Sequence, residues 1–485
     1  MKIGTMEDTH PDALVSGRRW ALLALTSVGA FMAPLDGSIV AVALPRMGPA
    51  LRLSFAASMW VQAAYLLAMA VLLIPLGRMA DRGGRLRYYL AGIVVFTLAS
   101  LAAALSRNGA ALVASRVAQG AGGALLSATS TAIITEVFPP GERGRALGIN
   151  VMAVYLGLSV GPPLGGLLVD RLGWPWIFLV NLPVGAAALA WGWSLLPSRE
   201  RGTASGRAAG TDFPGAALLG AFLVCLIVPL TFSTEWGWRA PAIWLLLALA
   251  PAAGAGFLLR EARAANPLVD LDLVRRNRLF AAANLAALLN YCALYAISVL
   301  TAVQLQLVLG HPARVAGWIM LGQPIMQALL SPLAGRLSDR MGSRTLATAG
   351  MLIVALGMVL LALSGKEARL HQVLGALALV GLGMAAFSAP NTSAIMGSVE
   401  RHQLSVASAF LATMRVTGQA LSVGLLGSIA ASRLGAGGWS QLLHHAGGPG
   451  VAGAFAWGYR AAMLTGAFLA LLGAWASRAR GTAHR

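Results

Sequence analysis

Apolar stretches long enough to cross a lipid bilayer follow one another along almost the whole chain, and no other feature limits its possible folds as strongly. A transmembrane helix needs about twenty mainly apolar residues. About fourteen segments meet this requirement, which predicts an all-α polytopic membrane protein. These segments are 20–44, 57–77, 88–105, 110–134, 146–168, 174–195, 213–232, 241–259, 280–309, 313–335, 345–363, 371–393, 403–430 and 458–477.

The composition agrees with a membrane location. Charged residues make up 11% of the chain and hydrophobic residues 58%, whereas about 25% of the residues are charged in an average soluble domain. The 57 glycines suit helices in lipid, where small residues let neighbouring backbones approach closely. We therefore expect the lipid bilayer to cover most of the surface, and we expect a monomer.

The net charge of +19 does not indicate a nucleic-acid-binding protein. Such proteins gather Lys and Arg on one soluble face, but here the arginines lie in short runs between apolar segments and only Lys2 and Lys366 are lysines. If the N-terminus is cytoplasmic, about 24 of the 36 basic residues fall in inside loops and tails and about 9 in outside loops. Basic residues accumulate on the cytoplasmic side of membrane proteins. This bias predicts a cytoplasmic (inner) membrane location with both termini cytoplasmic.

The sequence has none of the usual features of an enzyme or a metalloprotein. Cys225 and Cys292 fall in separate apolar stretches without the spacing of metal ligands. No segment matches a nucleotide-binding P-loop, and no nucleophile–base grouping is visible. We therefore expect no cofactor, no metal and no enzymatic activity.

One charged segment occurs twice. GRMADRGGRLR (Gly77–Arg87) returns as GRLSDRMGSRT (Gly335–Thr345), 258 residues later. Duplicated halves are a known architecture of transporters. Six spans of about 30 residues would separate the copies by roughly 180–200 residues, so about two further spans lie between the halves. We predict a six-helix bundle over 1–196, a two-helix insert with linkers over 197–262, and a second six-helix bundle over 263–485.

With these motifs the chain resembles the major facilitator superfamily, and in particular its fourteen-span drug:proton antiporter branch. The pattern G-x-L-x-D-R-x-G-R of that family follows the second span and is met twice here, with Met79 at the usual Leu of the first copy. In the family this loop latches the two halves together on the inside. The resemblance implies that role for Gly77, Asp81, Arg82, Gly84 and Arg85, and for Gly335, Asp339, Arg340, Gly342 and Arg344 in the second copy.

Two charged residues within predicted spans point to proton coupling. LDGSIVAVALP, with Asp36, resembles the first-span motif of the family, and RVAQGAGG, with Arg116, resembles its R-x-x-x-G motif. A charge inside a span is costly and indicates function. At 1.5 Å per residue, Asp36 and Arg116 lie at similar depths, so a pairing is allowed. Burial and a nearby guanidinium shift the proton affinity of a carboxylate in opposite directions.

Asp36 is therefore our candidate proton carrier and Arg116 its tuning partner. The alternative is an ion pair that only fixes the packing of two helices. Glu136, at the end of the fourth span, is interpreted as a charge of a loop or helix end rather than as a coupling site.

The fifth span carries GLSVGPPLGG, which resembles the antiporter motif G-x-x-x-G-P-x-x-G-G of the family. Glycines at four-residue spacing form a smooth stripe that permits close helix approach, and proline bends a helix. The resemblance implies export by exchange, with Gly157, Gly161, Pro162, Gly165 and Gly166 in a hinge or seal. Next, WPWIFLVNLPVG (Trp174–Gly185) resembles the start of the sixth span of the family.

The predicted function is proton-coupled antiport that exports lipophilic or drug-like small molecules by alternating access. Neutral, zwitterionic or monovalent substrates fit the sparse intramembrane acids. A lipid or glycolipid transporter, an uptake symporter and a non-transporting membrane scaffold or sensor are the alternatives. Arg415 has no evident acidic partner and could meet an anionic or polar substrate or a helix C-terminus. Candidate substrate-binding residues are Trp60, Gln62, Tyr65, Asn284, Asn290, Tyr291, Tyr295, Gln304, Gln306, Phe387, Asn391 and Arg415.

Overall fold

The computed structural model describes residues 11–196, 212–264, 267–268, 271–365, 367–400, 403–434, 437–443 and 448–479. These residues are almost entirely helical, and no strand occurs among them. Thirteen of their helices are long and apolar enough to cross a membrane. A further crossing is formed by α12 (Ala313–Met320) and α13 (Gly322–Met341), which follow each other directly. The count agrees with the expectation of about fourteen spans.

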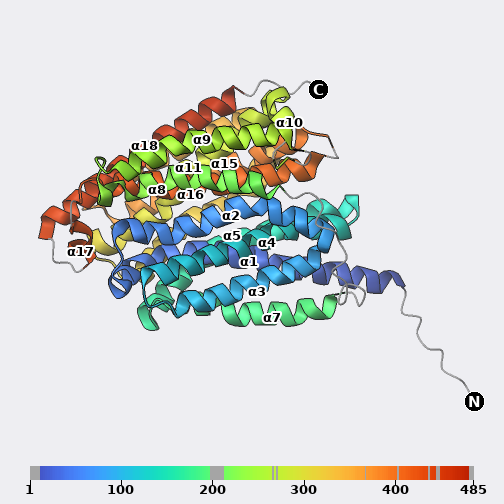
Figure 1. The fold of residues 1–485 in the computed structure, drawn as a ribbon, viewed down its shortest axis with the longest axis horizontal. Coiled ribbons are helices and arrows are strands. Elements are labelled where there is room, and N and C mark those ends of the chain that lie inside the picture. Colours follow the sequence, from blue (N-terminus) through green and yellow to red (C-terminus); the bar gives the residue numbers. More distant parts are fainter. Residues whose placement is uncertain are drawn as a thin grey trace, which may run out of the picture.

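Two bundles of helices lie side by side, and both ends of the described chain lie at the same end of the molecule, which we call the termini end (Figure 1). We call the opposite end the far end. The first bundle contains α1 (Pro11–Leu51), α2 (Phe55–Gly83), α3 (Arg85–Ala104), α4 (Gly109–Val137), α5 (Pro140–Arg171), α6 (Trp176–Leu179) and α7 (Asn181–Leu195).

The second bundle starts at α11 (Arg278–Val303), which continues as a π-helical turn over Gln304–Val308. After α12 and α13 it contains α14 (Ser343–Leu363), α15 (Leu370–Gly397), α16 (Leu404–Ala431), α17 (Gly438–Leu443) and α18 (Gly448–Arg478). Between α12 and α13 only Leu321 is not helical, and Pro324 just beyond it lacks the N–H that would bond back toward α12.

Between the bundles, α8 (Phe213–Trp236) and α9 (Pro241–Arg263) pack on each other, and the short α10 (Leu271–Arg276) follows. α8 contacts both α2 and α16, so it lies along the line where the two bundles meet. Arg260 of α9 donates to the buried Asp212 at the start of α8, at 3.1 Å. An ion pair thus joins the two inserted helices at the termini end.

The repeated charged segments differ from the prediction in one respect. The predicted spans leave cytoplasmic loops over 78–87 and 336–344 between them, but helices continue through nearly all of both segments. α2 ends at Gly83 and α3 begins at Arg85, with Gly84 between them at φ 95°; α13 and α14 meet in the same way at Gly342, at φ 84°. Glycine alone adopts this left-handed conformation without a steric penalty. One glycine therefore replaces each predicted loop.

The outer surface of the bundles is apolar. Leu329, Trp475 and Trp318 are 69%, 69% and 65% exposed, although side chains of this kind are normally buried in soluble proteins. An apolar surface of this kind is stable in contact with lipid tails. The described exterior is therefore suited to the bilayer that the sequence predicts.

Candidate substrate cavity and buried ion pair

Asp36 and Arg116, which the sequence could only place at similar depths, form an ion pair in the first bundle. Both side chains are fully buried, and Nη1 of Arg116 donates to Oδ2 of Asp36. Nε of Arg116 donates to the carbonyl of Val61 at 3.0 Å. A pair removed from water needs further hydrogen bonds to offset its desolvation. The neighbouring helices supply bonds to Nε and Nη1 of Arg116, whereas its Nη2 is buried without a partner among the described residues.

The second oxygen of Asp36 is bound by amides. Nε2 of Gln119 donates to Oδ1 at 2.7 Å, and Nδ2 of Asn181 donates to the same atom at 3.3 Å. Gln119 also accepts from Nη1 of Arg116 and donates to Ser100. The hydrogen-bonded network around this ion pair thus draws on five helices: α1, α2, α3, α4 and α7. The contribution of α3 is Ser100, which is bonded to Gln119.

Tyr65 connects this buried pair to the space between the bundles. The guanidinium of Arg116 lies over the Tyr65 ring, 4.4 Å from its centroid, at a distance typical of cation–π attraction. Two glycines of the R-x-x-x-G motif make room for Tyr65. A Cβ on Gly123 would lie 2.8 Å from the Tyr65 hydroxyl, and a Cβ on Gly120 would lie 2.4 Å from the backbone carbonyl oxygen of Tyr65.

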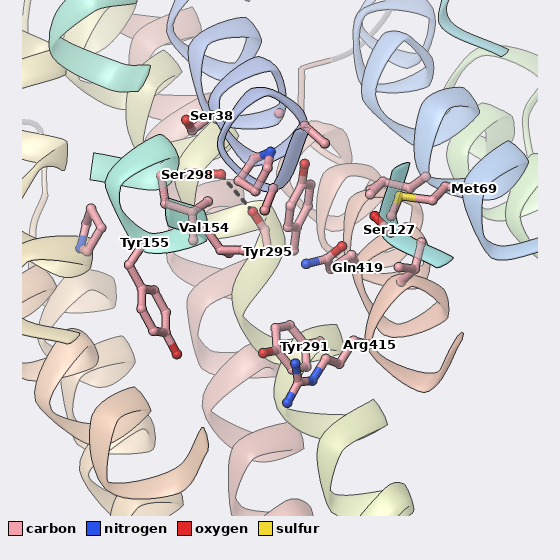
Figure 2. Close-up of a pocket in the computed structure, with 18 of the residues that line it drawn as sticks. Ser38, Met69, Ser127, Val154, Tyr155, Tyr291, Tyr295, Ser298, Arg415 and Gln419 are labelled. Carbon is pink, nitrogen blue, oxygen red and sulfur yellow. Dashed lines mark hydrogen bonds between the residues drawn. The ribbon is translucent and has the colours of Figure 1, made fainter. Parts of the chain in front are cut away.

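A cavity of about 450 Å³ lies between the two bundles (Figure 2). It is lined from the first bundle by α1, α2, α4 and α5 and from the second by α11, α12, α13, α15 and α16. Its size is within the range of pockets for drug-sized ligands. The wall is mainly apolar, and its aromatic side chains are Tyr65, Tyr155, Tyr291 and Tyr295.

The bundles are in close contact at the far end of this cavity. A Cβ on Gly166 of α5 would lie 2.4 Å from the carbonyl of Ala313, and one on Gly317 of α12 would lie 2.2 Å from the carbonyl of Pro162. Nε2 of Gln306 donates to the carbonyl of Val42 at 2.9 Å across the same boundary.

Toward the termini end α5 is less crowded. A Cβ on Gly148, Gly144 or Gly141 would meet nothing within 4 Å, and the same holds for Gly335 of α13. Thr131, which lines the cavity on α4 near this end, is exposed. The bundles are therefore packed together at the far end and are more open toward the termini end.

The antiporter-motif glycines serve as contacts of α5. Cβ atoms on Gly157, Gly161 and Gly165 would lie 2.4, 1.9 and 2.7 Å from atoms of Phe31, Ser38 and Ile39 on α1, whereas Gly166 faces α12. Pro162 lies in the cavity wall. These glycines thus pack α5 against α1 within the first bundle, and the last of them contacts α12 of the second bundle.

Two ion pairs of the first charged segment lie within the first bundle, and the latch stays a prediction. Arg85 pairs with Asp81 at 2.8 Å and with Glu136 at 3.0 Å, so these ion pairs stay within the first bundle. Glu136 is accordingly a helix-end charge. In the second copy Gly335, Arg340, Gly342 and Arg344 lie at the junction of α13 and α14. The side chain of Asp339 lies outside the described residues.

Of the predicted substrate-binding residues, Tyr65, Tyr291, Tyr295 and Arg415 line the cavity. Gln62 lies just behind it: Nε2 donates to the carbonyl of Gly37 at 3.0 Å, and Oε1 accepts from the Tyr295 hydroxyl at 3.5 Å.

The other predicted substrate-binding residues do not line this cavity. Trp60 packs against Phe232 of the insert. The others are buried between helices: Asn284, Asn290, Gln304, Gln306, Phe387 and Asn391.

Several residues that sequence reasoning did not select contribute to the site. Asn181 belongs to the segment WPWIFLVNLPVG, so the family resemblance contained a signal for it. Tyr155 precedes the antiporter motif by two residues but had no signal of its own. The amides of Gln323, Gln327 and Gln419 also line the cavity. Among the described residues no group of three or more His, Cys, Asp or Glu could hold a metal ion.

Comparison with known proteins finds a protein family that matches this chain. A family model described as Major Facilitator Superfamily matches residues 26–282 and 283–483. The chain is 30% identical over 421 residues to the riboflavin transporter RibZ of Clostridioides difficile, covering 86% of this chain and 89% of that protein. It is 35% identical over 415 residues to the multidrug resistance protein Stp of Mycobacterium tuberculosis, covering 85% and 76%.

A further relative is the tetracenomycin C resistance and export protein of Streptomyces glaucescens, 34% identical over 429 residues, covering 88% of this chain and 78% of that protein. Among solved structures, a bacterial homologue of the human lysosomal transporter Spinster, inward-facing and unoccupied, superposes with a TM-score of 0.67. It is 18% identical and covers 95% of this chain and 97% of its own. At this identity the likeness concerns the fold alone.

Proposed function

The chain belongs to the major facilitator superfamily, and from this premise we propose that it is a proton-coupled antiporter that exports lipophilic, drug-like small molecules across the cytoplasmic membrane. Two of the relatives described above are named for drug resistance, and one of these also for export. The mechanism that follows is argued from the residues of this chain.

The observation that carries the proposal is the buried pair of Asp36 and Arg116 behind Tyr65. A proton that binds Asp36 would weaken its pairing with Arg116 and leave a buried guanidinium without its counter-ion, which is costly. The cost falls if the helices move so that water or a substrate reaches Arg116. Because Tyr65 touches Arg116 and lines the cavity, protonation and cavity occupancy would influence each other.

The direction of transport follows from the proposed orientation. With cytoplasmic termini, as the distribution of basic residues favours, the termini end of the cavity faces the cytoplasm. Contacts of α5 with α12 then close the periplasmic side. This is the state in which an exporter would load a cytoplasmic substrate. Deprotonation of Asp36 to the cytoplasm and its protonation from the outside would complete an exchange cycle.

The test is substrate-dependent proton flux in proteoliposomes, with tetracenomycin C and riboflavin as separate probes and an internal pH dye as the readout. We expect the wild type to move protons when a probe is added against a proton gradient. Asp36→Asn should abolish this flux, because an amide cannot carry a proton. Asp272→Asn, which changes an exposed acid outside the spans, is the control and should behave as wild type.

The probes also separate the alternatives. Riboflavin is a second candidate substrate because a riboflavin transporter is among the relatives. Proton flux with riboflavin alone would favour riboflavin transport as the narrower function.

Equal flux in the wild type and Asp36→Asn would remove Asp36 from the mechanism. No flux with either probe, combined with tolerance of Asp36→Asn in cells, would favour a scaffold or sensor. A lipid transporter would instead move a labelled phospholipid between leaflets.

A further inference from the structure

Arg116 and Arg415 both lie inside spans, and they differ in how their charges are compensated. Arg116 has a carboxylate, an amide and a carbonyl as partners. In the part of the chain that the structure describes, Arg415 of α16 has one side-chain hydrogen bond, from Nη2 to the hydroxyl of Thr392 at 2.7 Å. A guanidinium carries five N–H donors, and Nε of Arg415 is buried without a partner among the described residues.

The described surroundings of Arg415 contain no compensating charge. Arg415 lines the cavity, and among the described lining residues no Asp, Glu or other charged side chain accompanies it. It is part of no ion pair in the described chain. A partly desolvated cation without a counter-ion is unfavourable inside a membrane protein. The cavity therefore has an excess positive charge that an anionic ligand would neutralise.

Aromatic and hydroxyl groups surround the same guanidinium. Its centre lies 5.7 Å from the centroid of the Tyr291 ring, and Figure 2 shows the two side chains next to each other. Tyr155 of the first bundle lines the same cavity as Arg415 and Tyr291. A ligand that reached Arg415 would thus have tyrosine rings from both bundles for its apolar part, which suits a flat aromatic molecule.

We infer that the substrates of this cavity are aromatic molecules that carry an anionic group, and that Arg415 binds that group. This inference rests on the proposed transport function, since it identifies the substrate class of the same cavity. It narrows the sequence-based expectation of neutral, zwitterionic or monovalent compounds to compounds that carry an anionic group. Charge-assisted hydrogen bonds from a guanidinium to a carboxylate or phenolate would supply the discrimination.

Binding of three probes with one aromatic skeleton tests the inference. Fluorescein, fluorescein methyl ester and rhodamine 123 differ mainly in charge, which runs from dianion through monoanion to cation at pH 8. Their affinities are measured by fluorescence polarisation with the detergent-purified full chain and no proton gradient. We expect the wild type to bind them in that order of decreasing affinity. Arg415→Gln should weaken fluorescein binding by about tenfold or more and should change rhodamine 123 binding by less than about twofold.

Two comparisons make the result decisive. Arg433→Gln removes an arginine that lies over Trp457 at 3.6 Å, outside the cavity, and should leave all three affinities unchanged. Arg415→Lys should retain part of the preference for fluorescein. Equal or stronger binding of rhodamine 123 by the wild type would overturn the inference, even if Arg415→Gln fails to fold. Because no proton gradient is used, failure of proton coupling would leave this measurement unaffected.

Discussion

At the scale of single residues, Gln119 lies between Arg116 and Gly120 of the R-x-x-x-G motif and is not itself a motif position. Its side chain nevertheless binds both members of the buried ion pair. Its Nε2 donates to Asp36 and Ser100, and its Oε1 accepts from Arg116. An amide can serve both members of an ion pair because it presents a donor and an acceptor. Gln119 therefore fixes the orientation of Asp36 relative to Arg116, and the energetic cost of the buried charges depends on that orientation.

Replacing Gln119 by Leu tests this role. The side chain keeps its approximate size but leaves buried polar groups unsatisfied, at a cost of about 1–3 kcal/mol. We expect a lower melting temperature in detergent and a reduced probe-dependent proton flux. Gln441→Leu, which changes an exposed glutamine of α17, is the control. An unchanged melting temperature and flux in Gln119→Leu would show that Asp36 and Arg116 need no such support.

At the scale of helices, α5 has two kinds of contact along its length. Its glycine stripe packs on α1, and Gly166 meets the start of α12 in the other bundle. Nearer its own start, Gly148 has open space around it. Small residues allow the backbones to approach at the first set of contacts, so α5 is held at the far end and less constrained at the termini end.

Two valine substitutions compare these regions on one helix. Gly166→Val would place its Cβ 2.4 Å from the carbonyl of Ala313, and overpacking of this kind costs about 1–3 kcal/mol. We expect it to disfavour the far-end contact and to slow transport severalfold in proteoliposomes. Gly148→Val should have little effect. Similar rates for the two variants would contradict a specific role for the contact between α5 and α12.

At the scale of the whole molecule, the two bundles meet around the cavity, and α8 lies along both. The far-end contacts include a hydrogen bond from the backbone N–H of Arg314 to the carboxylate of Asp170 at 3.0 Å. Alternating access requires such contacts to separate while the termini end closes. The charged segments at Gly84 and Gly342 lie at the termini end, where a latch could form in the other state.

A reversible cross-link tests this motion. Cysteines at Asp170 and Arg314, in a chain with Cys225→Ser and Cys292→Ala, would be joined by a short thiol-specific cross-linker. We expect the cross-linked protein to bind fluorescein but to lose transport, because the far end cannot open. Reduction of a cleavable linker should restore transport. Full transport by the cross-linked protein would exclude separation of the bundles at this contact.

The sequence alone determined the class of fold, the approximate number of spans and the family, because span length and the repeated segment are local properties of the chain. The motif resemblance also selected Asp36 and Arg116, although only the structure placed them in contact. The domain boundaries at 196 and 262 stay predictions.

Which polar residues face the cavity was decided by tertiary structure. Tyr295 and Gln304 lie nine residues apart on one apolar stretch, yet the first lines the cavity and the second is buried between helices. A helix that is apolar on all sides gives no pattern from which its orientation can be deduced. Its inward face is set by the shapes of its neighbours, and contacts such as those of Gly166 with Ala313 form only after both bundles have folded.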